Sequence, residues 1–536
     1  MRHHRSPAAR AFATAGAASS YARRTGCSID EASGTVVADG RPEVGVAVGV
    51  TRRGFLGGGL ALGAGALSPG WLTRPAKPAS PKPRVSERVV VIGSGIAGLS
   101  CAYRLWQEHG IASEVYEYNA DRPGGRLYTL RDYFDQGQYV EEHAEFISTE
   151  HVETRGLAAA FGLTLDNVNR YPVGTHGSEY QFRFGGRGWS QAVLNREWHE
   201  WAYELFADAA LRQAPWPTLY NRSTARAKQW DTMPATDWID AFVPGGLESD
   251  FGRLCVAILL DEYGGPVEGQ SALNLVYLLG TYDSVPSDRQ PKSQPQLSGT
   301  DEKWHIRGGN DQLIAGLVER LPAGTVKLGH QLVALASRGN GRYACTFTTA
   351  SGTREIVADQ VVLALPFTKL RDVELSRIDL PAPQLRAIQE EPLGSNSKIQ
   401  MQFSRRVWNA EHWTGNTYND EIVQGSWETT IDQPGPYGIL IALPGGAGGA
   451  DIGRRYQLSS YYGPAPEAMV RDYLACYEQF WPGVTSAYAG KAFYAWSSGD
   501  PHIEGAYSYL KVGQYTGFNG IQGRQHGRLH FAGEHT

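Results

Sequence analysis

The sequence predicts an α/β fold in which a discontinuous, Rossmann-like nucleotide-binding domain is combined with an α+β domain that carries a helical insertion. Three observations predict it. Residues 88–110 combine an apolar run, a Gly-rich turn and a helical pattern, and a short second strand follows. Aromatic and apolar residues at helical spacing mark the block 189–280. Strand-like runs return within 304–366 and 397–443.

Composition and charge exclude several functional classes. The 536 residues are 42% hydrophobic and carry a net charge of −5, so they can bury a large core but offer no basic surface for nucleic acid or for a stable membrane association. The five cysteines stand singly, without C-x-x-C pairs or neighbouring His clusters, so we expect buried thiols and no metal site. They are Cys27, Cys101, Cys255, Cys345 and Cys476.

The Gly-rich turn "VVVIGSGIAGLS" is the strongest local motif. Gly93 permits a tight turn, Gly95 lets the backbone approach a pyrophosphate, and Gly98 allows a helix to pack closely on a strand. The helix opens at Ile96 and Ala97, where free amides and the helix dipole favour a diphosphate. The motif predicts a dinucleotide site.

Two further features point to the kind of dinucleotide. Glu117 lies 19 residues beyond Gly98, at the end of the second predicted strand, where a carboxylate accepts the ribose hydroxyls and disfavours NADP. The segment "DRPGGRLYTL" then places Gly124, Gly125 and Arg126 where backbone and guanidinium can meet a second phosphate. Together these features predict FAD as the cofactor.

Four more blocks occur in order: "WHIRGGNDQLIAGLVERL", "DQVVLALPFTKLRDVEL", "SKIQMQFSRRVW" and "LHFAGEHT". With the FAD motifs they make residues 88–536 resemble the flavin-containing amine oxidase superfamily of monoamine, polyamine and L-amino acid oxidases. The resemblance implies an FAD-binding domain and a substrate-binding domain. The first would comprise 87–175, 304–375 and 505–536, and the second 176–303 and 376–504.

The resemblance also implies roles for individual residues. Val333 would contact the adenine, and Glu534 would lie at the FAD phosphates and ribityl chain. Lys398 would hold a water near flavin N5, although a lysine in "SKIQMQF" can also be an ordinary solvated strand residue. Trp496 and Tyr507 match aromatic positions around the flavin and substrate.

Ala506 stands where covalent members of the family have a cysteine, so the resemblance implies non-covalent FAD. The implied reaction transfers a hydride equivalent from the amine α-carbon to the flavin. The resulting imine is hydrolysed to a carbonyl, and O2 reoxidises the flavin to give H2O2. The implied partners are therefore a small amine or amino acid and O2, with a homodimer left open.

The segment "EEHAEFIS" bears on the substrate because it lacks the arginine that clamps a carboxylate in related amino acid oxidases. His143 replaces a glycine there and would face the flavin. Glu142 and Glu145 suit a cationic substrate tail, with a solvated or capping role as the alternative. We therefore favour an amine over an amino acid, while Arg183 or Arg187 could still provide a clamp.

Two other functions compete with this interpretation. A flavin desaturase or isomerase shares the nucleotide fold, but Lys398 and the Trp496/Tyr507 pair argue against it. A truncated, inactive flavin-binding relative is the second alternative, because the sequence stops at Thr536, before the family's next Gly-rich turn, second cage aromatic and helix. We expect such a chain to be poorly stable.

The N-terminal segment has its own pattern. Residues 1–50 are predicted to be a disordered or untranslated extension. In 51–86, Arg52 and Arg53 precede a Gly-rich apolar run that is shorter than the roughly 20 residues of a membrane span. A Pro-rich linker follows. This segment resembles a twin-arginine export signal, with a basic loop and small helix as the alternative, and it predicts an exported protein that folds around FAD first.

Overall fold

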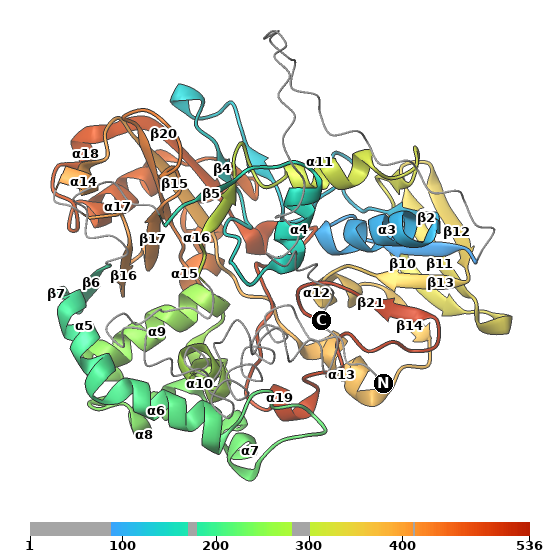
Figure 1. Ribbon diagram of the computed structural model, residues 1–536, viewed down its shortest axis with the longest axis horizontal. Helices are drawn as coiled ribbons and strands as arrows, with labels where there is room; N and C mark the ends of the chain where they lie inside the picture. The colour runs from blue at the N-terminus through green and yellow to red at the C-terminus, as the bar shows by residue number, and fades with distance from the viewer. Residues whose placement is uncertain (1–86, 170–179, 281–300, 411–412) are drawn as a thin grey trace, which may run out of the picture. The chain divides into compact units, whose positions relative to one another are not determined.

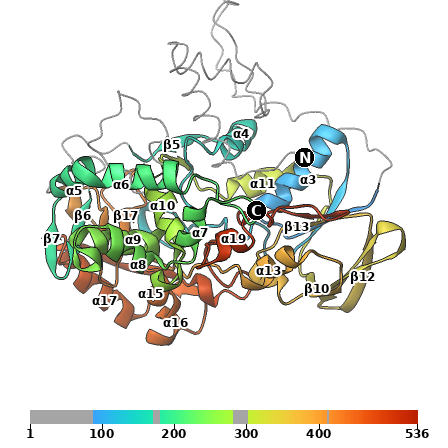
Figure 2. The ribbon, with the colours of Figure 1, turned by 90° about the horizontal axis from the view of Figure 1, so that it is seen from below.

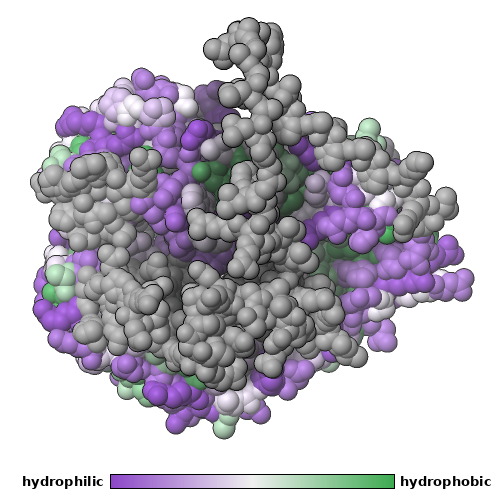
Figure 3. All heavy atoms as spheres, viewed as in Figure 1, coloured by the Kyte–Doolittle hydropathy of each residue, from purple (hydrophilic) through white to green (hydrophobic). Residues whose placement is uncertain are grey.

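The computed structural model describes residues 87–169, 180–280, 301–410 and 413–536. The predicted extension, signal and linker, together with Cys27, lie outside these ranges. Within them no helix is long and apolar enough to cross a membrane. On the face seen in Figure 3, hydrophilic residues cover most of the visible described surface, and hydrophobic residues form small groups between them.

A five-stranded parallel sheet has the strand order β21-β13-β1-β2-β9. Helix α3 (Ile96–His109) connects β1 to β2 and packs beside α11 (Gln312–Glu319) (Figure 1). This is the predicted Rossmann-like unit. Its strands are β1 (Val89–Ile92), β2 (Ser113–Tyr116), β9 (Val326–Lys327), β13 (Gln360–Leu363) and β21 (Leu529–Phe531).

The side chains of β1 enter two different cores because successive strand residues point to opposite faces. Val91 packs with Leu99 of α3, whereas Val90 belongs to the core that contains Phe347. Phe347 stacks on Tyr116 with 4.5 Å between ring centroids. It lies in a second sheet, ordered β12-β11-β10-β14. These strands are β10 (Gln331–Ser337), β11 (Tyr343–Thr349), β12 (Gly352–Ala358) and β14 (Glu374–Arg377).

The third large sheet has the order β19-β20-β15-β18-β17-β16-β6-β7. The alternation in "SKIQMQF" suggests one exposed face, but all six residues of β15 are buried. One face of this sheet packs on α17 (Glu467–Tyr477). The strands are β6 (Gln181–Phe184), β7 (Arg187–Trp189), β15 (Lys398–Phe403), β16 (Thr417–Asn419), β17 (Gly425–Glu428), β18 (Gly438–Ala442), β19 (Tyr462–Pro464) and β20 (Tyr488–Ala495).

Helices fill the predicted block up to Gly280, although Trp189 ends strand β7 instead of opening a helix. Figure 2 shows these helices grouped at the side opposite α3. Ser249 caps α9 by accepting a hydrogen bond from the Gly252 amide, and Gly264 ends it in a left-handed conformation. The helices are α5 (Gln191–Glu197), α6 (Tyr203–Asp208), α7 (Ala225–Asp231), α8 (Ala235–Phe242), α9 (Asp250–Tyr263) and α10 (Ala272–Gly280).

Short elements connect these layers. Trp304–Ile306 forms a strand that pairs with Leu165–Asn167. The remaining short strands are β3 (Thr129–Leu130), β4 (Val140–Glu141), β5 (Leu165–Asn167) and β8 (Trp304–Ile306). The remaining helices are α4 (Val152–Ala160), α12 (Phe367–Leu370), α13 (Ala382–Glu390), α14 (Val407–Ala410), α15 (Gly446–Ala450), α16 (Ile452–Arg455), α18 (Val484–Ala487) and α19 (Gln514–Gly517).

Candidate functional site

A cavity of about 1080 Å³ is lined by residues from both the parallel sheet and the eight-stranded sheet. Gly93 and Tyr116 line it from the carboxyl ends of β1 and β2, where ligands bind in open α/β sheets. Lys398, Tyr418 and Trp427 line it from β15, β16 and β17. The cavity therefore joins the predicted nucleotide site to the predicted substrate region.

The Gly-rich turn has the geometry that a dinucleotide needs. Gly93 has a φ of +101°, and a Cβ there would lie 2.4 Å from the Ala364 carbonyl oxygen. A Cβ at Gly98 would lie 2.1 Å from the Gly93 oxygen, so this glycine permits the close packing of α3. A Cβ at Gly95 would meet nothing within 4 Å. Gly95 lines the cavity with Ile96 and Ala97, so open space faces the start of the helix.

Glu117 is held rigidly at the end of β2. Its Oε2 accepts hydrogen bonds from the amide and the hydroxyl of Ser94, both at 2.7 Å. Its Oε1 accepts from the Asn119 amide at 2.9 Å. Because Glu117 also lines the cavity, its carboxylate is fixed where a ribose of the dinucleotide fits.

The second glycine motif meets the end of the chain. Gly124 and Gly125 have φ values of +114° and +56° and line the cavity. Arg126 Nη1 lies 3.1 Å from Glu534 Oε1 and also donates to the Ala506 carbonyl. Burial raises the pKa of Glu534, but Arg126, His535 and the Ser508 hydroxyl together outweigh burial and leave that pKa below its usual range. The second glycine motif and the C-terminal segment thus form one wall of the cavity. The hydrogen-bond donors of this wall fit a second phosphate.

Lys398 forms a buried ion pair instead of facing solvent. Its Nζ lies 2.6 Å from Glu145 Oε2, and the residue is 6% exposed. Glu145 Oε1 also accepts from Trp427 Nε1 at 3.0 Å and from Thr429 Oγ1 at 2.6 Å. Burial raises the pKa of Glu145, but Lys398 and these donors bring it below its usual value. Glu145 is therefore ionised at neutral pH.

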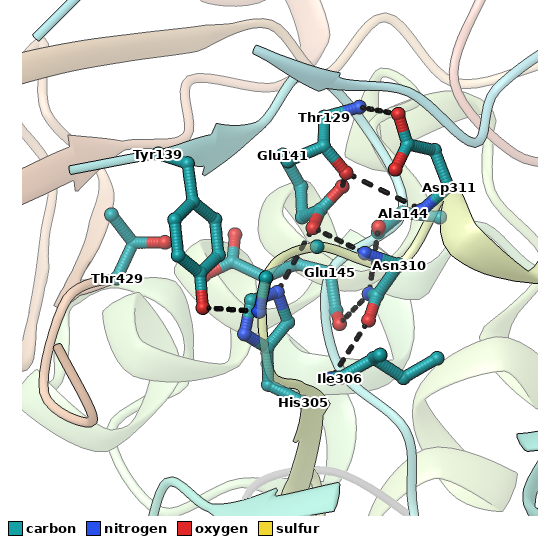
Figure 4. Close-up of polar contacts among 12 residues, drawn as sticks. Thr129, Tyr139, Glu141, Ala144, Glu145, His305, Ile306, Asn310, Asp311 and Thr429 are labelled. Atoms are coloured by element: carbon teal, nitrogen blue, oxygen red, sulfur yellow. Dashed lines mark hydrogen bonds and ion pairs between the residues drawn. The ribbon is translucent and has the colours of Figure 1, made fainter. Parts of the chain in front are cut away.

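A network behind the cavity supports this pair (Figure 4). The Glu141 carboxylate accepts from Thr129 Oγ1 at 2.9 Å and from the Asn310 amide at 2.8 Å. The Glu141 carbonyl accepts from Gln400 Nε2 at 2.7 Å and from Lys398 Nζ at 3.4 Å. Through the Glu141 carbonyl, the network positions the side chains of Gln400 and Lys398, which both belong to β15.

His305 is the cation of the network. Its Nε2 lies 2.9 Å from Glu141 Oε1 (Figure 4). Its Nδ1 lies 3.7 Å from Asp432 Oδ2. Burial lowers the pKa of His305, but Asp432 and Glu141 outweigh burial and raise that pKa to about 10. The imidazole is therefore protonated between two carboxylates at neutral pH.

Two further predicted residues line the cavity. Burial, together with the charge of Lys398, lowers the pKa of His143 to about 3, so its ring is neutral under ordinary conditions. The Tyr507 hydroxyl donates to the Asp261 carbonyl, which fixes the ring at the cavity wall. Ala506 lines the cavity beside it.

Val333 and Trp496 are not among the described residues that line the cavity. The register of β10 shifts between Leu332 and Ala334, and Leu332 faces the cavity in place of Val333. The Trp496 ring packs against Gly453 and Gly499, where a Cβ would lie 2.1 Å and 2.3 Å from it. The adenine contact of Val333 and the flavin contact of Trp496 stay predictions.

Three acidic residues that the sequence did not single out also line the cavity. Asp261 and Glu262 come from the last turn of α9, and Glu302 lies two residues before β8. Two acids at the end of the apolar run "AILLDEYGG" are unfavourable beside the negative end of a helix, and this signal could have revealed them. Within the described ranges no group of three His, Cys, Asp or Glu residues could hold a metal ion.

Comparison with known proteins assigns the family. Residues 96–536 match the model of the flavin-containing amine oxidoreductases. The chain is 22% identical over 442 residues to an L-glutamate oxidase precursor of Streptomyces diastatochromogenes, covering 68% of this chain and 64% of that protein. It is 23% identical to an L-amino-acid oxidase of Siganus canaliculatus, covering 85% and 82%.

The fold is also similar to that of cyclohexylamine oxidase from Brevibacterium oxydans, with a TM-score of 0.68 and 18% identity over 83% of this chain and 93% of that one. The family model covers most of the described residues, including the second glycine motif and the segment around Lys398. The chain therefore belongs to the flavin-containing amine oxidoreductases and has FAD as its cofactor.

Proposed function

We propose that this FAD-dependent oxidase acts on a cationic amine in preference to an amino acid. When bound, FAD accepts a hydride equivalent from the amine α-carbon and passes the electrons to O2. The chain has to bind the amine, place its α-carbon and exclude water. The cavity wall that contains Lys398, aromatic rings and carboxylates suits these tasks.

The charge of this wall is the observation that carries the proposal. Asp261, Glu262 and Glu302 line it, and Lys398 is already paired with Glu145. The other described cations that line the cavity are Arg122, Arg126 and Lys369. The first two belong to the second glycine motif, and Lys369 pairs with Glu504. A site that binds a substrate carboxylate needs a cationic side chain without another partner. The carboxylates of this wall instead attract a cationic substrate.

The two arginines that could have clamped an amino acid are engaged elsewhere. Arg183 Nε lies 3.3 Å from Glu421 Oε1, and Arg187 Nη2 lies 3.3 Å from Asp250 Oδ1. Neither is among the lining residues of the described chain. Both positions therefore favour an amine over an amino acid substrate.

We assign roles to four residues on this basis. Lys398 places a positive charge beside the reacting region, and its ion pair with Glu145 holds the ammonium group in position. Tyr507 presents a ring to the incoming amine, which suits cation–π attraction before the amine loses its proton. His143, being neutral, can only act there as a hydrogen-bonding group. Trp496 supports the wall from behind through its packing on Gly453.

The cofactor is proposed to be non-covalent because Ala506 offers no thiol at the cavity wall. Acid precipitation should then leave the flavin in the supernatant, and flavin in the pellet would contradict this. The parallel sheet and β10–β14 fit the proposed FAD-binding segments, and the eight-stranded sheet with α5–α10 fits the substrate-binding segments. Export through the twin-arginine-like segment is a separate proposal, and N-terminal sequencing of secreted protein tests it.

A peroxide-coupled screen of amines against L-amino acids tests the substrate class. We expect peroxide from amines. The alternative is an L-amino acid oxidase, which the two relatives named for amino acid substrates favour. Peroxide from L-amino acids alone would establish that alternative.

A further inference from the structure

We propose that Asn310 is a positioning residue for the amine oxidation: its side chain holds the backbone that carries Glu145 and, through Glu145, the ammonium group of Lys398. The inference rests on the proposed role of Lys398 and deepens it. Asn310 belongs to the motif "GGND" and is not among the described residues that line the cavity. It would therefore act on the reaction only through other residues.

The segment 142–146 runs along the cavity outside any strand. β4 ends at Glu141, and all five residues of the segment line the cavity. The Ala144 amide donates to the Arg126 carbonyl at 3.2 Å, and strand-like pairing returns only at Ile147. The carbonyls of Ala144 and Glu145 lie between these two paired points, where a side chain can supply their hydrogen bonds.

Asn310 supplies these hydrogen bonds (Figure 4). Its Nδ2 donates to the Glu145 carbonyl and, at 3.4 Å, to the Ala144 carbonyl. Its backbone amide donates to Glu141 Oε1 at 2.8 Å, just before the segment. Its Oδ1 accepts from the Ile306 amide at 3.0 Å, which fixes the orientation of the side-chain amide. Asn310 is 2% exposed, so water has little access to compete for these bonds.

The turn that carries Asn310 is itself held firmly. Gly308 and Gly309 have φ values of +87° and +114°, which glycine adopts without strain. A Cβ at Gly309 would lie 2.5 Å from Arg131 Nη2. The same Nη2 lies 2.6 Å from Oδ1 of Asp311, the residue after Asn310. The turn is thus anchored on both sides of the asparagine.

The effect of this anchoring reaches the cavity through the Glu145 carboxylate. Lys398 Nζ lies 2.6 Å from that carboxylate, and Lys398 lines the cavity. Loss of the Asn310 amide would release the Glu145 backbone, and the ammonium group would move with its partner. A displacement of about 1 Å in a reacting arrangement can cost about 10²-fold in rate. A cation near a bound flavin also favours its reduced, anionic state, so the reduction potential reports the same displacement.

The experiment is a mutant cycle that combines Asn310→Ala with the charge-free background Glu145→Gln/Lys398→Met. Rates are measured on FAD-loaded protein, per bound flavin, with the amine that is oxidised fastest in the peroxide-coupled screen. With the native pair present, Asn310→Ala should slow flavin reduction about 10- to 100-fold and lower the reduction potential. In the charge-free background it should change the rate less than about twofold and leave the potential unchanged.

Two further variants separate positioning from folding. Asn310→Asp keeps the size of the side chain but removes the amide donor, so it should show the same losses even where Asn310→Ala folds poorly. Asn274→Ala is the matched control. Asn274 is 1% exposed, its Nδ2 donates to the Leu510 carbonyl at 2.9 Å, and it is absent from the described cavity lining. This control should lower the melting temperature and leave rate and potential unchanged.

Three results decide against the proposal or its basis. Equal effects of Asn310→Ala with and without the Lys398–Glu145 pair would show a general structural role and overturn the positioning role. A wild-type rate and potential in Asn310→Asp would overturn it as well. If no amine reduces the flavin, the proposed function fails, and the potential, which needs no substrate, decides whether Asn310 positions Lys398.

Discussion

Lys398 Nζ lies 2.6 Å from Glu145 Oε2, and both side chains are buried. The contact joins strand β15 to the segment that follows β4, two regions 253 residues apart in the chain. Trp427 and Thr429 complete the hydrogen bonding of Glu145. The ammonium group of Lys398 is thus held in place by Glu145, whose carboxylate is itself held by two further hydrogen bonds. Replacing either Lys398 or Glu145 alone should therefore destabilise the protein.

Lys398→Met should lower the free energy of unfolding by about 3–5 kcal/mol, because Glu145 becomes an unpaired buried carboxylate. The double variant Glu145→Gln/Lys398→Met should recover part of this loss. Both should form peroxide about 10²-fold more slowly, since the fixed charge is gone. Denaturant unfolding and a peroxide assay measure the two effects. Lys228→Met, at an exposed position of α7, is the control. Unchanged stability of Lys398→Met would refute the buried pair.

Gly95→Ala and Gly98→Ala should separate cofactor binding from folding. Gly95 has φ −64° and open space around its Cβ position, so alanine should leave the apoprotein stable but weaken FAD binding by about 1–3 kcal/mol. Gly98→Ala should instead destabilise the fold, because its Cβ would meet the Gly93 carbonyl at 2.1 Å. Flavin content and apoprotein melting temperature test this. Normal FAD affinity in Gly95→Ala would place the cofactor elsewhere.

His305 should make stability depend on alkaline pH. Its folded-state pKa, about 10, lies above the ordinary value near 6.5. Its stabilising contribution is therefore complete below pH 6.5 and is lost as pH rises toward 10, by at most about 1.4 kcal/mol per pH unit. The stability difference between wild type and His305→Gln should shrink over this window. A constant difference would show that His305 is not a buried cation.

The nucleotide half of the fold could be predicted from the sequence because its signals are local. The glycines from Gly93 to Gly98 lie within one turn, and Glu117 follows on the next strand. Backbone sterics alone dictate glycine at Gly93 and Gly98, as their contacts with Ala364 and with each other show. The FAD cofactor followed from the same local pattern.

The substrate half could be predicted only in part because it depends on contacts between distant segments. The sequence indicated Lys398 and Tyr507 but not the pairing of Lys398 with Glu145, nor the burial of β15 on both faces. It also missed Glu262 and Glu302, which line the same cavity from α9 and from the segment before β8. The sequence also showed no sign of the register shift in β10 beside Leu332, which lines the cavity, while the adenine contact of Val333 stays a prediction.

Anaerobic mixing of the FAD-loaded protein with single substrates tests the central claim most directly. The visible absorbance of the oxidised flavin reports whether a substrate has delivered its electrons. We predict that amines bleach it and that L-glutamate does not. Bleaching by L-amino acids alone, or by none of these compounds, would contradict the account.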